Sequence, residues 1–172
     1  MRTLAVIVLA AIFSTPQSVV EKFCAAYVKQ KEYGLLEGRD RRIIAPMLTK
    51  RLLRQLDDLT ACQQDWVKQQ PQNTTDKPPF VDCCLFTSMP DGMPTTYNIG
   101  LAQKLGEGRY RVAIGWEREE KRHETLQWTD ALIVQEQPNG EYRIDDVVWH
   151  LDENPFNLST GFKNCREGHW VE

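Results

Sequence analysis

The sequence predicts an α+β fold in which N-terminal helices pack on a curved antiparallel sheet. Apolar residues recur at helical spacing in the first half of the chain, whereas in the second half they alternate with polar residues. Turn sequences such as Pro138-Asn139-Gly140 separate the alternating segments, as they do between the strands of hairpins. Helices followed by a meander of strands are typical of the α+β class.

Residues 1–18 have the layout of a secretory signal peptide. Arg2 supplies a positive start, ten apolar residues run from Leu4 to Phe13, and small or polar residues follow up to Ser18. Ten apolar residues are too few to span a bilayer, which takes about 20. We therefore expect cleavage between Ser14 and Ser18, one mature domain over residues 19–172, and a periplasmic or secreted protein without a transmembrane segment in the mature chain.

Two long helices are predicted in the first half. The first begins after Ser18, a plausible N-cap, and has an apolar face made of Val19, Val20, Phe23, Ala26 and Tyr27. The second begins after Thr49, also a good N-cap. Its apolar stripe consists of Leu52, Leu56, Leu59 and Trp66, widened by Leu53 and Cys62. The polar residues 68–79 then predict an exposed loop between the helical half and the sheet half.

Strands are predicted in the second half. Their ranges are 80–87, 97–105, 110–116, 126–134 and 142–151. A hairpin through residues 117–125 would put the apolar residues of its two strands on one face, with Trp116 beside Trp128. Gly106-Glu107-Gly108 predicts the turn before the third strand.

Composition excludes some classes of function. The 172 residues carry a formal net charge of −3, and the pI is near 5.7, which argues against a nucleic-acid-binding protein. His123, His150 and His169 lack the short helical spacing of metal ligands, and no G-x-S-x-G turn nominates a nucleophile. The glycines are scattered and form no phosphate-binding loop. We therefore predict no metal and no cofactor.

Five cysteines become informative if the protein is exported, because thiols pair in oxidising compartments. Since five is odd, at least one stays free or pairs between chains. We predict a bridge from Cys62, near the end of the second helix, to Cys83 or Cys84, and a second bridge from Cys24 to Cys165. The alternative is that several of these cysteines are small buried residues.

Several segments resemble a bacterial family of exported or lipid-anchored domains of unknown function in the nuclear-transport-factor-2-like superfamily. They are Ser18-Val19-Val20-x-x-Phe23-x-x-x-Tyr27, Pro79-Phe80-Val81-Asp82, Leu85-Phe86-Thr87-Ser88, Tyr110-Arg111-Val112 and Tyr142-Arg143-Ile144-Asp145-Asp146-Val147. The likeness covers about residues 18–150 and rests on order and spacing. It implies a cone-shaped sheet closed on one side by helices, often with a pocket between them, and it implies no activity. Cys83 and Cys84 depart from the family pattern.

Asp130 is the most informative polar residue, because it falls on the apolar face of its strand between Trp128 and Leu132. A buried carboxylate is unfavourable unless it is paired or hydrogen-bonded. We hypothesise that Trp116, Trp128 and Asp130 line a cleft between the helices and the sheet, with Asp146 as a weaker candidate. Asp146 would share its face with His150, as an acid–base couple or as a neighbour contact. The alternative is that Asp130 satisfies backbone donors and has a structural role.

Three functions follow from these observations. The first is non-catalytic binding of a small ligand or a protein partner by an envelope domain. The second is an immunity-type protein that neutralises a periplasmic toxin, for which small size, acidic charge and export are suitable. The third is a pocket enzyme of the isomerase or dehydratase type, with Asp130 as the base. An enzyme is therefore the less favoured class, and a homodimer is left open.

Overall fold

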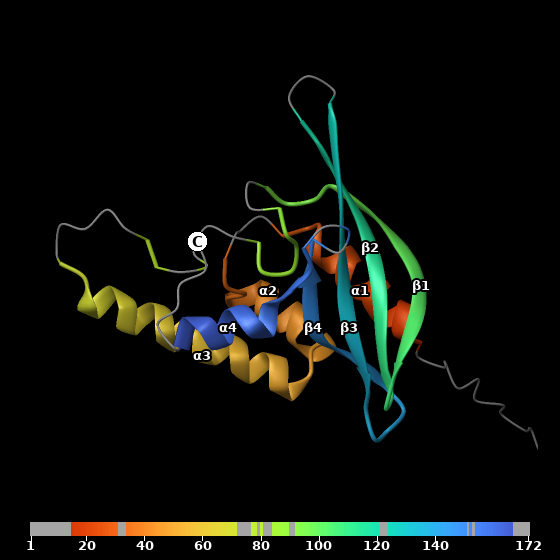
Figure 1. Ribbon diagram of the computed structural model, residues 1–172, viewed down its shortest axis with the longest axis horizontal. Helices are drawn as coiled ribbons and strands as arrows, with labels where there is room; N and C mark the ends of the chain where they lie inside the picture. The colour runs from red at the N-terminus through yellow and green to blue at the C-terminus, as the bar shows by residue number, and fades with distance from the viewer. Residues whose placement is uncertain are drawn as a thin grey trace, which may run out of the picture.

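The computed structural model describes residues 15–30, 34–71, 77–78, 80, 84–89, 92–120, 124–150, 152 and 154–166, with side chains up to 164. Within these residues the fold is α+β, as predicted (Figure 1). The helices are α1 (Pro16–Tyr27), α2 (Gly38–Ile44), the 3₁₀ turn η1 (Ala45–Met47), α3 (Lys50–Gln69) and α4 (Leu158–Arg166). The strands are β1 (Thr96–Gly106), β2 (Arg109–Glu119), β3 (Thr125–Glu136), β4 (Tyr142–Trp149) and β5 (Phe156–Asn157).

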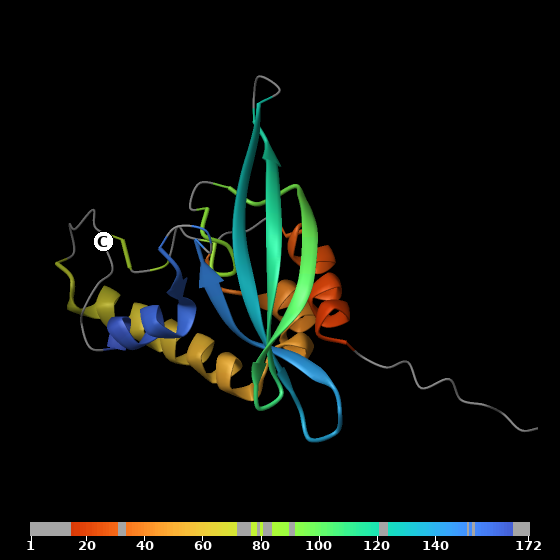
Figure 2. The same ribbon diagram turned by 45° about the vertical axis from the view of Figure 1, so that its right-hand side comes forward.

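The five strands form one open sheet in the order β1-β2-β3-β4-β5, and every neighbouring pair is antiparallel. The helices lie on one side of this twisted sheet, and Figure 2 turns its opposite face toward the viewer. One main core fills the space between them, with buried residues from α1, α3 and the inner face of β2, β3 and β4. None of the helices in the described part of the chain is both long and apolar enough to cross a bilayer.

Helix α1 begins earlier than the sequence predicts. Thr15, not Ser18, is the N-cap: its hydroxyl accepts from the backbone N–H of Ser18, and the Ser18 hydroxyl reaches back to the N–H of Thr15. Pro16 is at the first helical position, where its fixed φ suits a helix start. The predicted signal peptide lies outside the described residues as far as residue 14, so its cleavage stays a prediction. The predicted apolar face is confirmed for Val19, Val20, Phe23 and Tyr27, which are buried.

Helix α3 confirms the second helical prediction, including its cap. The Thr49 hydroxyl accepts from the N–H of Leu52 at 3.1 Å, and Leu52, Leu56 and Leu59 are buried. The stripe does not continue to Trp66, which is only half-buried. The second half of α3 extends past the edge of the sheet, so fewer neighbours cover it (Figure 1).

The predicted strand at 80–87 is wrong for the residues that the structure describes there. Residues 84–88 form turns, and Phe80 has a left-handed φ of 61°, which a strand does not accommodate. Cys84, Leu85, Phe86 and Thr87 are nevertheless buried. Phe86 packs on Phe23 and Tyr27 of α1, with ring centroids 5.0 and 5.8 Å apart. The apolar run is therefore a buried loop, which we call the core loop (residues 84–89).

The hairpin of β2 and β3 has the predicted register. Trp116 pairs with Trp128 and Ile114 pairs with Asp130, so all four side chains share the face toward the helices. The strand predicted at 97–105 is also confirmed, as β1. The turn that joins it to β2 is tight, since residues 106–108 all have positive φ.

Strand β4 contains a bulge that the sequence pattern did not predict. Val134 pairs with Ile144 but Ile133 pairs with Asp146, so Asp145 is an extra residue. Beyond a bulge the side-chain alternation changes phase. Unbroken alternation from Ile144 would put Asp146 on the apolar face, but in the structure Val147 takes that position in the main core.

Candidate functional site

Asp130 is fully buried and its carboxylate is surrounded by donors. Oδ2 accepts from the Thr87 hydroxyl at 2.8 Å and from the Ser88 backbone N–H at 2.9 Å. Oδ1 accepts from the backbone N–H of His150 at 3.0 Å. Asp130 thus joins the core loop, β3 and the end of β4. These contacts are those of a structural carboxylate, the second of the two roles that its position in the sequence suggested.

The two tryptophans of the predicted site pack on the core side. Trp116 is 1% exposed, and its ring lies 5.9 Å from that of Tyr27 and 6.3 Å from that of Tyr97. Trp128 is half-buried, and its indole Nε1 donates to the Thr87 hydroxyl at 2.6 Å. Since Thr87 in turn donates to Asp130, the ring of Trp128 is fixed by the same group of contacts.

A groove of about 440 Å³ opens at the sheet between β1, β2, β3 and the segment after β4. Its lining is Asn98, Gly115, Trp116, Glu117, Gln127, Trp128, Thr129, His150 and Asp152. Because successive residues of a strand point to opposite faces, the side chains of Glu117, Gln127 and Thr129 point away from the helices. The groove therefore lies on the face opposite the predicted cleft, and we call it the outer groove.

Gly115 keeps the centre of the outer groove open. A Cβ at this position would meet only the Asn98 carbonyl oxygen, at 3.9 Å, and the Asn98 Cβ, at 4.0 Å. On the neighbouring strands β1 and β3, the residues beside Gly115 are Asn98 and Thr129, which have hydrogen-bonding side chains. A glycine inside an alternating strand often marks a close backbone approach or a bound group, and this was the signal in the sequence that could have pointed here.

Two carboxylates line the outer groove, those of Glu117 and Asp152. Glu117 is held in place, because Oε1 accepts from Gln127 Nε2 at 2.7 Å and Oε2 accepts from the Thr96 hydroxyl at 3.2 Å. No lysine or arginine is among the described residues that line it. The outer groove is thus polar and acidic.

His150 occupies a strained position at the rim of this groove. Its φ is 51°, a left-handed conformation that costs a non-glycine residue of order 1–3 kcal/mol and recurs at functional sites. The hydrogen bond from its N–H to Asp130 holds it there. Asp130 is thus not itself a lining residue of the outer groove, but it positions one that is.

Asp146 takes no part in the outer groove and contacts other residues. It is buried, and its carboxylate accepts from the N–H groups of Val147 at 2.9 Å and Ser159 at 3.0 Å and from the Ser159 hydroxyl. Ser159 is in the first turn of α4, so Asp146 caps that helix. Asp146 and His150 are both among the described residues, and no hydrogen bond or ion pair joins them. The predicted acid–base couple is therefore not formed.

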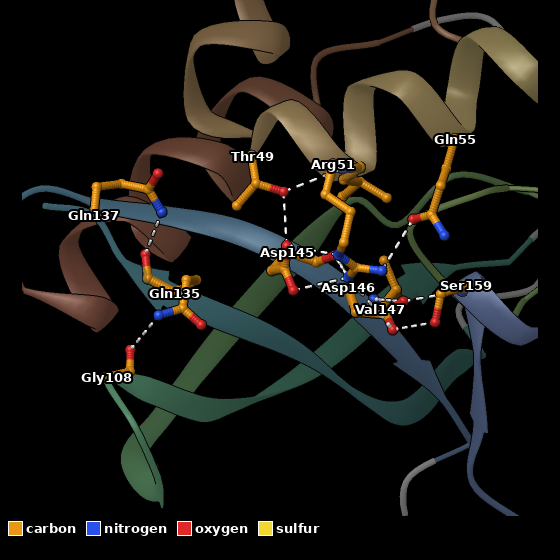
Figure 3. A network of polar contacts seen from close by, with 11 residues as sticks. Thr49, Arg51, Gln55, Gly108, Gln135, Gln137, Asp145, Asp146, Val147 and Ser159 are labelled. Atoms are coloured by element: carbon orange, nitrogen blue, oxygen red, sulfur yellow. Dashed lines mark hydrogen bonds and ion pairs between the residues drawn. The ribbon is translucent and has the colours of Figure 1, made fainter.

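A second polar cluster joins the start of α3 to the β4 bulge (Figure 3). Arg51 donates from Nε and Nη2 to the two carboxylate oxygens of Asp145, at 3.0 and 2.8 Å, and Thr49 donates to Oδ1 at 2.7 Å. Burial by itself raises the pKa of Asp145. The hydrogen bonds from Arg51 and Thr49, with the positive charges of Arg51 and Arg109, outweigh it and hold this pKa below its ordinary value.

The cysteines differ from the predicted pairing in two respects. Cys24 and Cys84 are buried free thiols, so the bridge from Cys24 to Cys165 and the pairing of Cys62 with Cys84 are wrong. Burial raises the pKa of both thiols and keeps them unreactive. Cys62 is disulfide-bonded. The pairing of Cys62 with Cys83 stays a prediction, because Cys83 lies outside the described residues, as does the side chain of Cys165.

Within the described part of the chain, no group of three or more His, Cys, Asp or Glu side chains is arranged to hold a metal ion. His123 and His169 lie outside it.

Comparisons with protein-family models, curated proteins and solved structures found no match to this chain.

Proposed function

We propose that this chain is an exported, non-catalytic binding protein that holds a small, positively charged molecule in the outer groove. The observation that carries the proposal is the pairing of an open groove of about 440 Å³ with two carboxylates, Glu117 and Asp152. The volume is within the range of about 300–1,000 Å³ that small-molecule sites occupy.

The chemistry of the lining favours an amine or a guanidinium. A charged N–H donor makes a stronger hydrogen bond to a carboxylate than a neutral donor does. Glu117 is already oriented by Gln127 and Thr96, so little further ordering is needed when a ligand binds. Asn98, Thr129 and His150 add hydrogen-bonding groups around the two acids.

The contacts of Asp130 favour binding over isomerase or dehydratase chemistry. A general base must come within hydrogen-bonding reach of the proton that it removes. Asp130 is fully buried and both of its oxygens accept hydrogen bonds from the protein itself. A substrate would have to displace the core loop or the end of β4 to reach it.

The resemblance to nuclear-transport-factor-2-like domains is part of the proposal at the level of architecture. Helices that precede an antiparallel meander support it. In that superfamily a ligand pocket is expected between the helices and the sheet, whereas the groove proposed here is on the other face. In this chain the space on the helix side is occupied around Trp116 by Tyr27, Phe86 and Phe23.

The proposal is tested by calorimetric titration of the mature protein with arginine, lysine and putrescine, with glutamate and succinate as anionic controls. We expect saturable binding of at least one cation and none of the dicarboxylates. Gly115→Val would fill the groove and weaken binding at least about tenfold, a loss of about 1.4 kcal/mol. Ala113→Val is the matched control, since this residue is on the same strand and face but does not line the groove.

Charge is tested separately with Glu117→Gln and Asp152→Asn. Each removes one carboxylate with little change in shape, so we expect weaker cation binding with an unchanged melting temperature. The proposal would be wrong if none of the three cations bound, or if Gly115→Val and Ala113→Val bound them equally well.

A further inference from the structure

A second groove, of about 460 Å³, lies where the β3–β4 hairpin meets the start of α3. Its lining is Thr49, Lys50, Arg51, Gln135, Gln137, Pro138, Asn139, Arg143 and Asp145. Figure 3 shows part of it, with Thr49 and Arg51 above Asp145, and Gln135 and Gln137 to one side. We call it the hairpin groove.

The charge of the hairpin groove is opposite to that of the outer groove. Three cations line it (Lys50, Arg51 and Arg143) and one carboxylate, that of Asp145. Arg51 is committed to Asp145 through both carboxylate oxygens, so these two charges offset each other within the wall. Lys50 and Arg143 remain as two positive charges that the lining does not neutralise.

Both of these cations are available to a ligand. Lys50 is exposed and forms no ion pair with any residue in the described part of the chain. Among the described residues, Arg143 has one ion pair, a long one of 3.4 Å to Glu141, whose side chain is largely exposed. An exposed pair of this kind contributes little and is easily exchanged for a better partner.

The amide side chains of the hairpin groove are held by the backbone around them. Gln135 Nε2 donates to the Glu136 carbonyl at 3.1 Å and Gln137 Nε2 donates to the Gln135 carbonyl at 3.1 Å. The Asn139 side-chain oxygen accepts from the Glu141 N–H at 3.1 Å, and its amide NH₂ group donates to the Glu141 carboxylate. The amide side chains that line the hairpin groove are therefore already ordered, and the cations Lys50 and Arg143 line the same groove.

We propose that the hairpin groove binds a small molecule through a phosphate group held between Lys50 and Arg143. Lys50 and Arg143, whose exposed contact with Glu141 is readily exchanged, supply two positive charges that match a phosphate dianion, and lysine and arginine are the side chains that most often contact phosphate. The space is larger than a phosphate ion requires, so a phosphomonoester is the expected ligand class. This site is separate from the outer groove and does not depend on the function proposed there.

The test is a titration of isotope-labelled mature protein, followed by NMR, with inorganic phosphate and with glycerol 3-phosphate at constant ionic strength. We expect saturable shifts centred on residues 49–51 and 137–143 with at least one of them. Lys50→Gln combined with Arg143→Gln should weaken binding at least about tenfold. Arg54→Gln, which removes an exposed cation of the same helix outside the groove, should leave the affinity unchanged.

Three outcomes would overturn the proposal. The first is the absence of saturation with both phosphates, and the second is an equal response to sodium chloride alone. The third is equal affinity of the double variant and Arg54→Gln. Melting temperatures and spectra of each unliganded variant establish that the fold is retained before affinities are compared. Titration with succinate distinguishes a phosphate site from a site for any dianion, and equally tight binding of succinate would contradict the assigned class.

Discussion

The backbone N–H of His150 donates a hydrogen bond to Oδ1 of Asp130 over 3.0 Å. Through this contact a buried carboxylate on the helix side of the sheet holds a left-handed residue at the rim of a groove on the other side. The core loop is attached to the same carboxylate through Thr87 and Ser88. Folding of the core and shaping of the outer groove are therefore coupled at one residue.

Asp130→Asn should destabilise the protein. The amide has the same shape, but its NH₂ group cannot accept the hydrogen bonds that one carboxylate oxygen now accepts. We expect the free energy of unfolding to fall by about 1–3 kcal/mol, measured by urea denaturation. Asp152→Asn, at an exposed acid of the outer groove, is the control and should leave stability unchanged. Equal stability of Asp130→Asn and the unmodified protein would contradict the structural role assigned to Asp130.

His150→Gly should increase stability and weaken ligand binding at the outer groove. Glycine adopts a φ of 51° without the steric penalty that histidine incurs, and the N–H that contacts Asp130 is kept. We expect a net gain of up to about 1 kcal/mol in the free energy of unfolding, because the greater freedom of glycine in the unfolded chain offsets part of the relieved strain. His150→Ala separates the effects, because it removes the imidazole without relieving the backbone. A glycine variant no more stable than the alanine variant would show that the backbone is not strained at this position.

The contribution of Asp145 to stability should depend on pH in a defined direction. Its pKa is lower in the folded protein than the value of about 3.9 expected in the unfolded chain. The stabilisation is therefore fully present above that value, and it is lost as the pH falls through the lower folded value. We expect the stability difference between the unmodified protein and Asp145→Asn to shrink between about pH 5 and pH 2. Glu37→Gln, at an exposed residue, is the control; a constant difference for Asp145→Asn would contradict the prediction.

One disulfide, joining Cys62 to Cys83, is expected in the mature protein. Two of the five cysteines are then oxidised, and thiol counting on unfolded, unreduced protein should find three free thiols. Peptide mapping should recover Cys24 and Cys84 as free thiols, which are buried and slow to react before unfolding. In the chain-entropy model, the closed loop of about 21 residues between Cys62 and Cys83 stabilises the folded protein by about 3 kcal/mol. Cys62→Ser should therefore lower the free energy of unfolding. Five free thiols, or a bridge to Cys84, would refute the pairing.

Export should yield a mature chain that begins between Thr15 and Val19. The capping box refines this expectation toward Thr15, because removal of Thr15 would leave the first turn of α1 without its cap. Mass spectrometry of protein purified from the periplasm or medium gives the N-terminal residue directly. An intact Met1, or protein found in the cytosol alone, would contradict export. Thr15→Ala, if processed normally, should lower stability by about 0.5–2 kcal/mol.

Local periodicity was sufficient to predict the long helices α1 and α3 and the β2–β3 hairpin, whereas the shorter helices α2 and α4 were not predicted. The leucine stripe of α3, the cap at Thr49 and the alternation in β2 and β3 depend on neighbours within a few residues, which the sequence displays directly. It also placed Asp130 on the apolar face beside Trp128, where the structure has it. The same reasoning predicted a strand at the core loop, because a short apolar run has no period that distinguishes a strand from a buried loop.

Tertiary structure alone decided what Asp130 and Gly115 do. Asp130 takes its partners from residues about 20 and 42 positions away, and no spacing in the sequence shows that Thr87, Ser88 and His150 converge on one carboxylate. Gly115 becomes the open centre of a groove only when Asn98 and Thr129 lie beside it on neighbouring strands. The bulge at Asp145 likewise puts Val147, and not Asp146, on the apolar face with Ile144. Each of these features depends on strand register and long-range contacts, which are set by packing and not by the order of residues within one element.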